Sequence, residues 1–329
     1  MEKPSQGVKD KKLKSEFAKP VYESDRIKAR IKHNFCIPIV KEHNFIHECS
    51  VAKMPGILLA SFKSETYNPP SESYDPEEHV TKNCLRQLAR KEYEHFLGKC
   101  YYSMTSYKNT VRITIPHKKN FLIILNTQSS IMEDDFMQLV QNYYWNVVQK
   151  IEKLKLKCTT KLQLFNEGEI SRKEMLEDFF SDEPKNRPEL NASLKKIGFN
   201  KKMRYIAIGT EDGIPLARVV NVNEPLLLPK FDEFEYFIET AAGITMRDKF
   251  SSILGGYKFN LVVYEKIAVL TIPETDKKFF TLVTFDNKMK DKEASKYERD
   301  CEHEFYFPKL MDKITKFITK YDVMKDFKS

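Results

Sequence analysis

Glycine is scarce in this chain, with ten glycines among 329 residues. Phosphate-binding loops depend on closely spaced glycines, and neither G-x-G-x-x-G nor G-x-x-x-x-G-K-[ST] occurs. The G-x-S-x-G motif of α/β-hydrolases is also missing. These gaps exclude the common motif-bearing nucleotide-binding and hydrolase folds. We therefore expect a protein that is not an enzyme and that holds no cofactor, with an enzyme of unrecognised site as a remaining alternative.

Long hydrophobic runs are missing as well. The longest apolar runs are strand-sized, such as FLIIL at 121–125, so no membrane span is expected. No apolar stretch follows the early lysines, as a secretory signal would require. The six cysteines are scattered along the chain without a dense framework, at positions 36, 49, 84, 100, 158 and 301. We expect reduced thiols and a cytoplasmic location.

Acidic residues do not balance the basic ones, and the formal net charge is +8. Six lysines stand among the first nineteen residues, in a stretch that is poor in apolar residues. Such a composition is typical of a solvated, disordered arm, so 1–20 is predicted as a disordered basic tail. Arginine and interleaved aromatic residues are missing from it, and we expect no nucleic acid partner.

What the chain does contain is an internal repeat. LGKCYYSMTSYKNTVRITIP begins at Leu97, and LGGYKFNLVVYEKIAVLTIP begins at Leu254, 157 positions later. At this offset thirteen residues between positions 56 and 116 are identical, where average residue usage would give roughly four. In the first copy these are Gly56, Ile57, Leu59, Ala60, Asp75, Glu78, Arg90, Leu97, Gly98, Tyr107, Thr114, Ile115 and Pro116. We interpret the pattern as the duplication of one domain.

Each copy is predicted to follow the order β-β-α-β-β-β-α. In the second copy, alternating apolar residues predict strands at 204–209, 214–220, 257–264, 267–272 and 279–285, and helical spacing predicts helices at 231–254 and 305–321. The first copy gives strands at 46–54, 57–63, 99–107, 111–115 and 121–126, with helices at 76–97 and 132–154. Further helices are expected near 22–33 and 169–180. The predicted class is α+β, with two copies of a five-stranded antiparallel sheet flanked by helices.

The domain boundaries follow from this order of elements. Residues 21–157 form the first repeat and 201–325 form the second. The segment 158–200 contains Glu-Pro and Arg-Pro pairs among several charges, and we interpret it as a linker with one or two short helices.

Candidate chemical sites are few. The stretch HNFCIPIVKEHNFIHEC places His33, Cys36, His43, His47 and Cys49 close together, but their spacing matches no common zinc pattern. A buried cysteine and a satisfied histidine are the preferred interpretation, and Cys301 with His303 supplies only one further ligand pair. The acidic residues Glu133, Asp134, Asp135, Glu167 and Glu169 are interpreted as favourable charges at helix starts. No metal or catalytic residue is predicted.

Three stretches of the second copy have a familiar pattern: RYIAIGTEDGIPLARVV, a helix that ends in MRDKFSSILGG, and YKFNLVVYEKIAVLTIP. Together they resemble the roadblock/longin (profilin-like) superfamily. The second copy looks most like uncharacterised roadblock-like proteins of ammonia-oxidising archaea, which have helix ends of the form R-x-x-F-x-x-x-L-G. The first copy has Arg90, Tyr93, Leu97 and Gly98 at these positions, and its hairpin turn is Pro55-Gly56 in place of Asp212-Gly213.

The resemblance implies a non-catalytic interaction or scaffold module. Members of this superfamily pair through the strand after the central helix, and several regulate small Ras-like GTPases. We therefore expect 99–107 to pair with 256–264 within the chain as an intramolecular pseudo-dimer, and a protein partner that could be a small GTPase. The predicted interface residues are Tyr101, Tyr102, Met104, Tyr107, Tyr257, Phe259, Leu261 and Tyr264. The alternative is a PAS- or GAF-like pair of small-molecule sensor domains, which would hold a ligand between sheet and helices.

Overall fold

The computed structural model describes residues 21–67, 75–117, 120–133, 145, 147–151, 162–181, 192, 194–195, 203–220, 230–274 and 278–287. The expected helix at 305–321, the candidate pair Cys301 and His303, and Asp134 and Asp135 lie outside these residues. Of the helix expected at 132–154, residues 145 and 147–151 are described as helical, whereas Met132 and Glu133 are the last two residues of a 3₁₀ turn, so Glu133 ends a turn where a helix start was predicted.

The first half of the chain forms three consecutive helical segments, a hairpin, a long helix and three strands. The N-terminal segments are α2 (Val21–Ile31), the π-helix η1 (Lys32–Cys36) and α3 (Ile37–Glu42). They are followed by β1 (Ile46–Lys53), β2 (Ile57–Lys63), α4 (Pro76–Glu92), α5 (Glu94–Leu97), β3 (Cys100–Tyr107), β4 (Thr110–His117), β5 (Phe121–Gln128) and the 3₁₀ turn η2 (Ser129–Glu133). The hairpin β1–β2 forms as predicted, with a cis peptide bond between Met54 and Pro55 at its turn.

The second half repeats this order. Its elements are α8 (Arg172–Phe180), β6 (Met203–Thr210), β7 (Pro215–Val220), α10 (Lys230–Asp248), α11 (Ser251–Leu254), β8 (Tyr257–Tyr264), β9 (Ile267–Pro273) and β10 (Phe279–Asp286). The predicted strands therefore agree with the observed ones to within about two residues at each end, the usual margin for such boundaries.

All ten strands join into one antiparallel sheet, in the order β2-β1-β5-β4-β3-β8-β9-β10-β6-β7. The predicted α+β class is confirmed, but the expected five-stranded units are continuous with each other. The reason is that β3 and β8 pair directly in the middle of the sheet, as predicted for 99–107 and 256–264. Each half of the sheet has the same strand order from its outer edge to the centre: β2-β1-β5-β4-β3 in the first half corresponds to β7-β6-β10-β9-β8 in the second.

The strand registers also repeat at the offset found in the sequence. Ser103 faces Thr114 across β3 and β4, and 157 positions later Asn260 faces Thr271 across β8 and β9. In the outer hairpins, Ser50 faces Ser61 as Ala207 faces Arg218. The offset of 157 residues thus relates not only the sequences of the two halves but also their pairs of facing strand residues.

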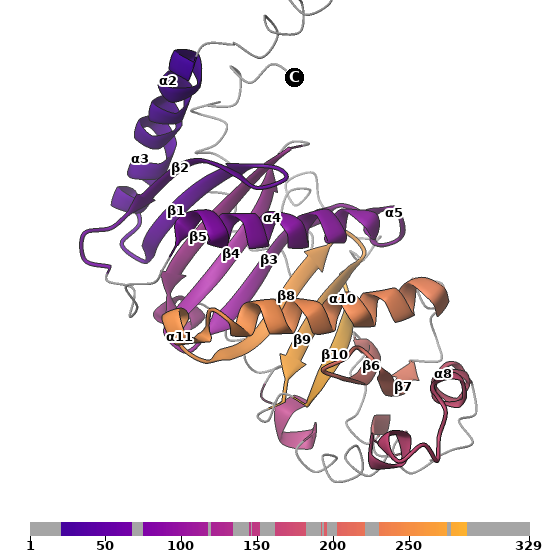
Figure 1. Cartoon of the computed structure of the whole chain (residues 1–329). Coiled ribbons are helices and arrows are strands. Elements are labelled where there is room, and N and C mark those ends of the chain that lie inside the picture. Colours follow the sequence, from indigo (N-terminus) through magenta and orange to yellow (C-terminus); the bar gives the residue numbers. More distant parts are fainter. Residues whose placement is uncertain are drawn as a thin grey trace, which may run out of the picture.

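The long helices α4 and α10 lie next to each other across one face of the sheet (Figure 1). The predictions of unbroken helices at 76–97 and 231–254 were wrong, because α4 ends before Tyr93 and α10 ends before Phe250. At both breaks the amide donates to the carbonyl three residues earlier, Arg90 or Arg247, which tightens the turn. Both ring side chains are thereby buried, at 4% exposure each.

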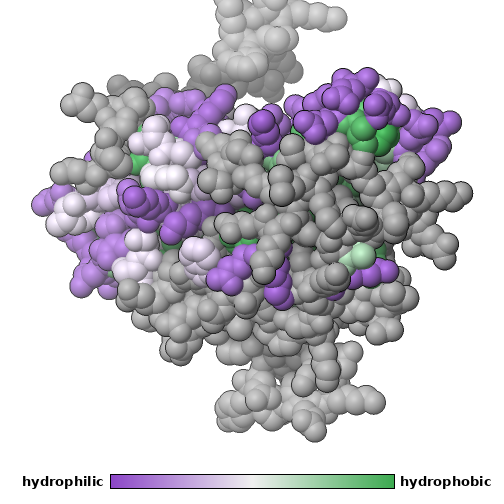
Figure 2. Space-filling model, turned by 90° about the horizontal axis from the view of Figure 1, so that it is seen from below, coloured by the Kyte–Doolittle hydropathy of each residue, from purple (hydrophilic) through white to green (hydrophobic). Residues whose placement is uncertain are grey.

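The two faces of the central strands differ in chemistry. The face opposite α4 and α10 is apolar, with Met104, Ile113, Leu261 and Leu270 in one large core. On the face beneath the helices, the central strands instead carry serine, threonine, asparagine and arginine, all buried: Ser103, Thr105, Arg112, Thr114, Asn260 and Thr271. Most of the outer surface that Figure 2 shows in colour is hydrophilic, and its hydrophobic areas are small and separate.

The start of α8 corrects one prediction about acidic residues. Glu167 and Glu169 follow the end of the helical residues 162–166 and are exposed, so they do not begin a helix. The helix instead begins with a capping box, in which Ser171 accepts from the amide of Glu174 and the carboxylate of Glu174 accepts from the amide of Ser171. These two bonds lower the pKa of Glu174.

Among the described residues, no helix has the length and hydrophobicity that crossing a membrane requires.

Candidate functional site at the joint of the two halves

The joint between β3 and β8 has an internal two-fold pattern. Met104 faces Leu261, its own equivalent in the repeat, so the pattern is centred on this pair. Going outward, Thr105 faces Asn260 as Val262 faces Ser103, and the pairs continue symmetrically to Tyr107 with Tyr257 and Tyr264 with Cys100. Even the two register irregularities, before Tyr102 and before Tyr107, are equivalent.

All eight predicted interface residues lie on these two strands. Tyr102, Met104, Phe259 and Leu261 point into the large apolar core, with Tyr101 packed against it. Tyr107, Tyr257 and Tyr264 lie on the other face, in clusters that contain residues of α10 or α11. The alternation predicted for these strands thus divides the set between two faces, except that the consecutive residues Tyr101 and Tyr102 contact the same core at the register irregularity between Cys100 and Tyr102.

Hydrogen bonds close both ends of the joint in the same way. At one end the Glu265 amide donates to the Lys99 carbonyl at 2.9 Å, and at the other the Lys108 amide donates to the Gly256 carbonyl at 3.0 Å. Gly98 and Gly255 precede the two strands at φ values of 78° and 87°. A Cβ on Gly98 would lie 2.6 Å from the Cβ of Glu265, so the close approach of the halves needs glycine there.

A pocket of about 60 Å³ opens above this joint, between α4 and α10. Residues of both halves line it: Arg86, Ala89, Arg90, Tyr236, Glu239, Thr240, Gly243, Arg247, Asn260, Val262 and Thr271. Three of these side chains are arginines, and one is a carboxylate. Arginine is almost never buried unless it is paired, so the charge balance of this pocket is unusual.

The three arginines are held by few hydrogen bonds. Arg90 Nη1 donates to Ser103 Oγ at 2.7 Å, and Arg86 Nε donates to the Lys82 carbonyl at 3.3 Å. The Arg247 guanidinium lies 5.9 Å from the centre of the Tyr257 ring. Within the described residues, Arg86 Nη2 and Arg247 Nε have no hydrogen-bond partner, although the two side chains are 8% and 5% exposed. Two buried cationic donors are therefore free at this pocket.

The charges of the pocket affect each other. Burial lowers the pKa of Arg86 well below its ordinary value, and the nearby Arg247 lowers it further. The pKa of Arg90 is lowered by burial and then by Arg247. Burial raises the pKa of Glu239 to about 7, although a hydrogen bond with Tyr93 and the charge of Arg90 act in the other direction. Arginine stays protonated in proteins, so three cationic groups share this pocket with a carboxylate that is partly protonated near neutral pH.

A fourth buried arginine extends this positive region along β4. Arg112 is 1% exposed and lies over the Phe250 ring at 5.4 Å. Its Nε donates to Asn126 Oδ1 at 2.9 Å, and Asn126 Nδ2 donates to Glu48 Oε2 at 2.7 Å, so an amide links this arginine to a carboxylate. The pKa of the buried His79 is lowered well below its ordinary value by burial and by the charges of Arg112, Arg86 and Lys82.

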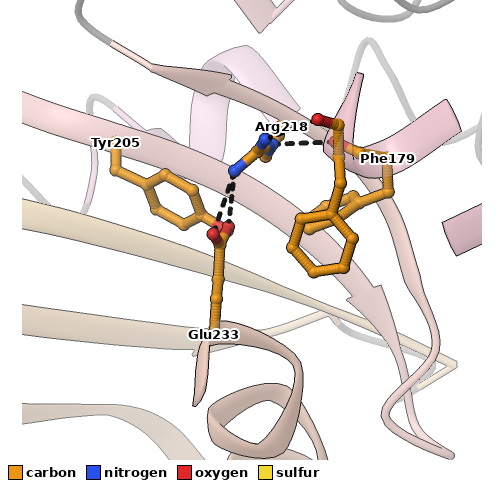
Figure 3. A network of polar contacts seen from close by, with 5 residues as sticks. Phe179, Tyr205, Arg218 and Glu233 are labelled. Atoms are coloured by element: carbon orange, nitrogen blue, oxygen red, sulfur yellow. Dashed lines mark hydrogen bonds and ion pairs between the residues drawn. The ribbon is translucent and has the colours of Figure 1, made fainter. Parts of the chain in front are cut away.

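A second polar network joins α8 to the outer strands of the second half (Figure 3). Arg218 on β7 donates through Nη1 to both oxygens of Glu233 on α10, at 3.1 and 2.9 Å. Its Nε donates to the Phe179 carbonyl at 2.8 Å and its Nη2 to the Phe180 carbonyl at 3.2 Å. The hydroxyl of Tyr205 donates to Glu233 Oε1 at 2.5 Å. The network is fully paired and fixes the end of α8, which is a structural role.

The candidate zinc residues are distributed differently. Cys36 and Cys49 are fully buried in the large apolar core, and the ring of His47 stacks on Tyr67 at 4.5 Å. Burial raises the pKa of the Cys49 thiol well above its ordinary value, followed by the effect of Cys36. Among the described residues, no three His, Cys, Asp or Glu side chains are grouped as a metal site would require.

Sequence reasoning missed most of the pocket. Arg90 and Arg247 were recognised as a matching pair, but only as fold punctuation, and Arg86, Arg112 and Glu239 were not singled out. A signal was present in α4, where Arg90 falls on the stripe of buried positions that includes Val80, Cys84 and Gln87. An arginine on the core-facing stripe of a helix is rare enough to mark a site.

Comparisons with known proteins add little to this geometry. No protein-family model matches the sequence, and no curated protein matches it. Among solved structures, the gliding protein MglB from Thermus thermophilus aligns with 26% of this chain, at 14% identity and a TM-score of 0.23, and the alignment covers 61% of that chain. The extracellular domain of vpHK1S-Z8, assigned as a histidine kinase, aligns with 84% of this chain and 87% of its own length, at 7% identity and a TM-score of 0.20. Both TM-scores are too low to establish a shared fold or function.

Proposed function

We propose that the chain is a non-catalytic protein-interaction module made of two roadblock-like copies that pair with each other. The observation that carries the proposal is the two-fold register of β3 and β8, centred on Met104 and Leu261. A strand edge with free backbone groups tends to pair, and here each half covers the edge of the other. Because both halves belong to one chain, their effective concentration is high and the pair needs no second subunit.

The partner surface in this proposal is the outer side of the helix pair α4 and α10. Leu85 and Leu88 on α4 are 49% and 37% exposed, and Ile238 on α10 is 41% exposed. Partner surfaces of non-obligate complexes are about as apolar as the rest of a protein, so a few exposed aliphatic side chains among charges are sufficient. On the resemblance of the sequence to the roadblock superfamily, the proposed partner is a small Ras-like GTPase.

The test is capture of purified Ras-like GTPases by the immobilised full chain, with each GTPase loaded with GDP or with a non-hydrolysable GTP analogue. We expect capture to depend on the nucleotide and to be lost in the double variant Leu85→Glu, Leu88→Glu. The matched control is Trp145→Ser, which removes an apolar side chain that is 48% exposed. Trp145 lies in a helical segment whose residues Val147 and Ile151 belong to the core on the opposite face of the sheet, away from α4 and α10. Equal capture in both nucleotide states, or none, would contradict the GTPase assignment.

The small-molecule sensor remains the alternative proposal, and the size of the pocket weighs against its usual form. Sites for drug-sized ligands have volumes of roughly 300–1,000 Å³. The pocket between α4 and α10 has about 60 Å³, and Val262, Tyr236 and three arginines are among the residues that line it. A sensor built on this pocket would therefore have to recognise a much smaller ligand.

A further inference from the structure

We propose that the pocket between α4 and α10 binds one small tetrahedral oxyanion, phosphate either free or as the end group of a small phosphorylated compound. The proposal concerns Arg86, Arg90 and Arg247, and it does not depend on the identity of the protein partner. It rests on three observations: the composition of the pocket, its free donors, and its volume.

The donors come from both halves and converge on one space. Arg86 and Arg90 stand one turn apart on α4, Arg247 stands on α10, and all three line the same pocket. Arg86 Nη2 and Arg247 Nε are buried without a hydrogen-bond partner in the described part of the chain. A buried cationic donor that lacks a partner is costly, and a bound anion would remove that cost. Guanidinium groups bind phosphate oxygens in bidentate fashion, which suits this donor set.

The carboxylate at the pocket does not neutralise the arginines. Among the described residues of the lining, Glu239 is the one acidic side chain, and its pKa of about 7 leaves it partly protonated at neutral pH. Asn260, whose Oδ1 accepts from Thr105 Oγ1 at 3.0 Å, and Thr271 form a polar floor on β8 and β9. An oxyanion would thus meet cationic donors from the helices and neutral polar groups from the sheet.

The size of the pocket limits the ligand. The pocket of about 60 Å³ is small, since one water takes about 30 Å³ in the liquid, so it accepts only a body of a few heavy atoms. The four oxygens of one tetrahedral anion match this room, and a nucleotide does not. Gly243 maintains the space, because a Cβ there would lie 2.9 Å from Arg247 Nη1. The residue equivalent to Gly243 in the first half is Arg86. The two halves thus differ at this position, where one provides a cationic donor and the other leaves space for a ligand.

The experiment is titration of the full chain with inorganic phosphate, measured by isothermal calorimetry and by thermal unfolding. Chloride keeps the ionic strength constant. Parallel titrations use glycerol phosphate and acetate, to separate free phosphate, a phosphate end group and a simple carboxylate. We expect saturable phosphate binding, with a Kd raised about tenfold or more in Arg86→Gln and in Arg247→Gln. Both variants relieve repulsion between arginines, so we expect them to fold.

Two further variants keep the proposal open to refutation. Arg26→Gln removes the same charge from an exposed position on α2 and should leave the Kd unchanged. Gly243→Ala leaves the charge unchanged but displaces the Arg247 guanidinium, and it should weaken binding. Phosphate stabilisation that is equal in the native chain and in Arg86→Gln, or that does not saturate at millimolar concentration, would overturn the proposal. Binding of glycerol phosphate alone would identify a phosphorylated compound as the ligand.

Discussion

Removing Glu233 should destabilise the chain strongly, because it leaves Arg218 charged in a buried site. The two side chains are 7% and 5% exposed, and their closest atoms, Arg218 Nη1 and Glu233 Oε2, are 2.9 Å apart. Breaking a buried ion pair by deleting one partner costs about 3–5 kcal/mol, since the remaining charge has no compensation. Tyr205 would lose its acceptor as well, and burial together with Glu233 raises the pKa of Tyr205, so its phenol stays a neutral donor. We expect Glu233→Ala to lower the free energy of unfolding by about 4 kcal/mol.

The assay is urea unfolding followed by circular dichroism, with the midpoint compared at unchanged slope. Replacing both partners by apolar residues, as in Arg218→Met with Glu233→Leu, should cost much less than the sum of the single changes, because no charge is left unpaired. The control is Lys173→Met, which breaks the ion pair with Glu177 on α8. That pair is exposed, so its loss should cost less than about 0.5 kcal/mol.

Arg218 should also determine whether α8 stays docked. Two of its three donor groups bind carbonyls in the last turn of α8, those of Phe179 and Phe180. Amide hydrogen exchange in residues 172–180 should therefore accelerate more in Arg218→Met than exchange in β8. A loss of less than about 1 kcal/mol in Glu233→Ala, or a double variant as unstable as the sum of the singles, would refute the reasoning.

Three more predictions concern the joint and the pocket. Burial raises the pKa of Glu239 to about 7, so its stabilising contribution is present at low pH and lost as the pH rises through that value. Glu239→Gln removes this loss, so its free energy of unfolding relative to the native chain should be about 1 kcal/mol higher at pH 8 than at pH 5, a figure reduced for the partial exposure of the side chain. Urea titrations at both pH values measure the difference. His79 has a lowered pKa, so stability should fall as the pH drops below about 6.5, and His79→Gln should flatten that fall in a thermal unfolding series; an unchanged slope would contradict it. Gly98→Ala and Gly255→Ala each place a Cβ at positive φ against the other half and should cost about 1–3 kcal/mol, while Gly256→Ala, with open space around it, should cost little; equal effects of the three would count against the joint as described.

The sequence by itself determined the elements and their order. Alternation in 257–264 and helical spacing before Leu254 reflect which side chains must face the core, and these periods are local properties of the chain. The repeat then carried the prediction further, to the pairing of the strands that contain Met104 and Leu261. That prediction succeeded because a strand after the central helix has no other cover for its edge.

Local patterns failed where a distant residue decides the outcome. The helix breaks at Tyr93 and Phe250 come from rings that turn into the core, and apolar spacing alone continues through both positions. The S-x-x-E spacing of Ser171 and Glu174 is that of a capping box and marks the true helix start, whereas the acidic residues Glu167 and Glu169 predict a start that the structure contradicts.

Only the tertiary structure decided the chemistry of the pocket. Arg86 and Arg90 could face water or the core on an amphipathic helix, and the position of α10 over the same strands buries them beside Arg247. Arg218 likewise meets Glu233 and the end of α8 only after three elements have packed together. A charge gains or loses its partner through neighbours that are remote in sequence, and the local periodicity that predicts strands and helices contains no information about them.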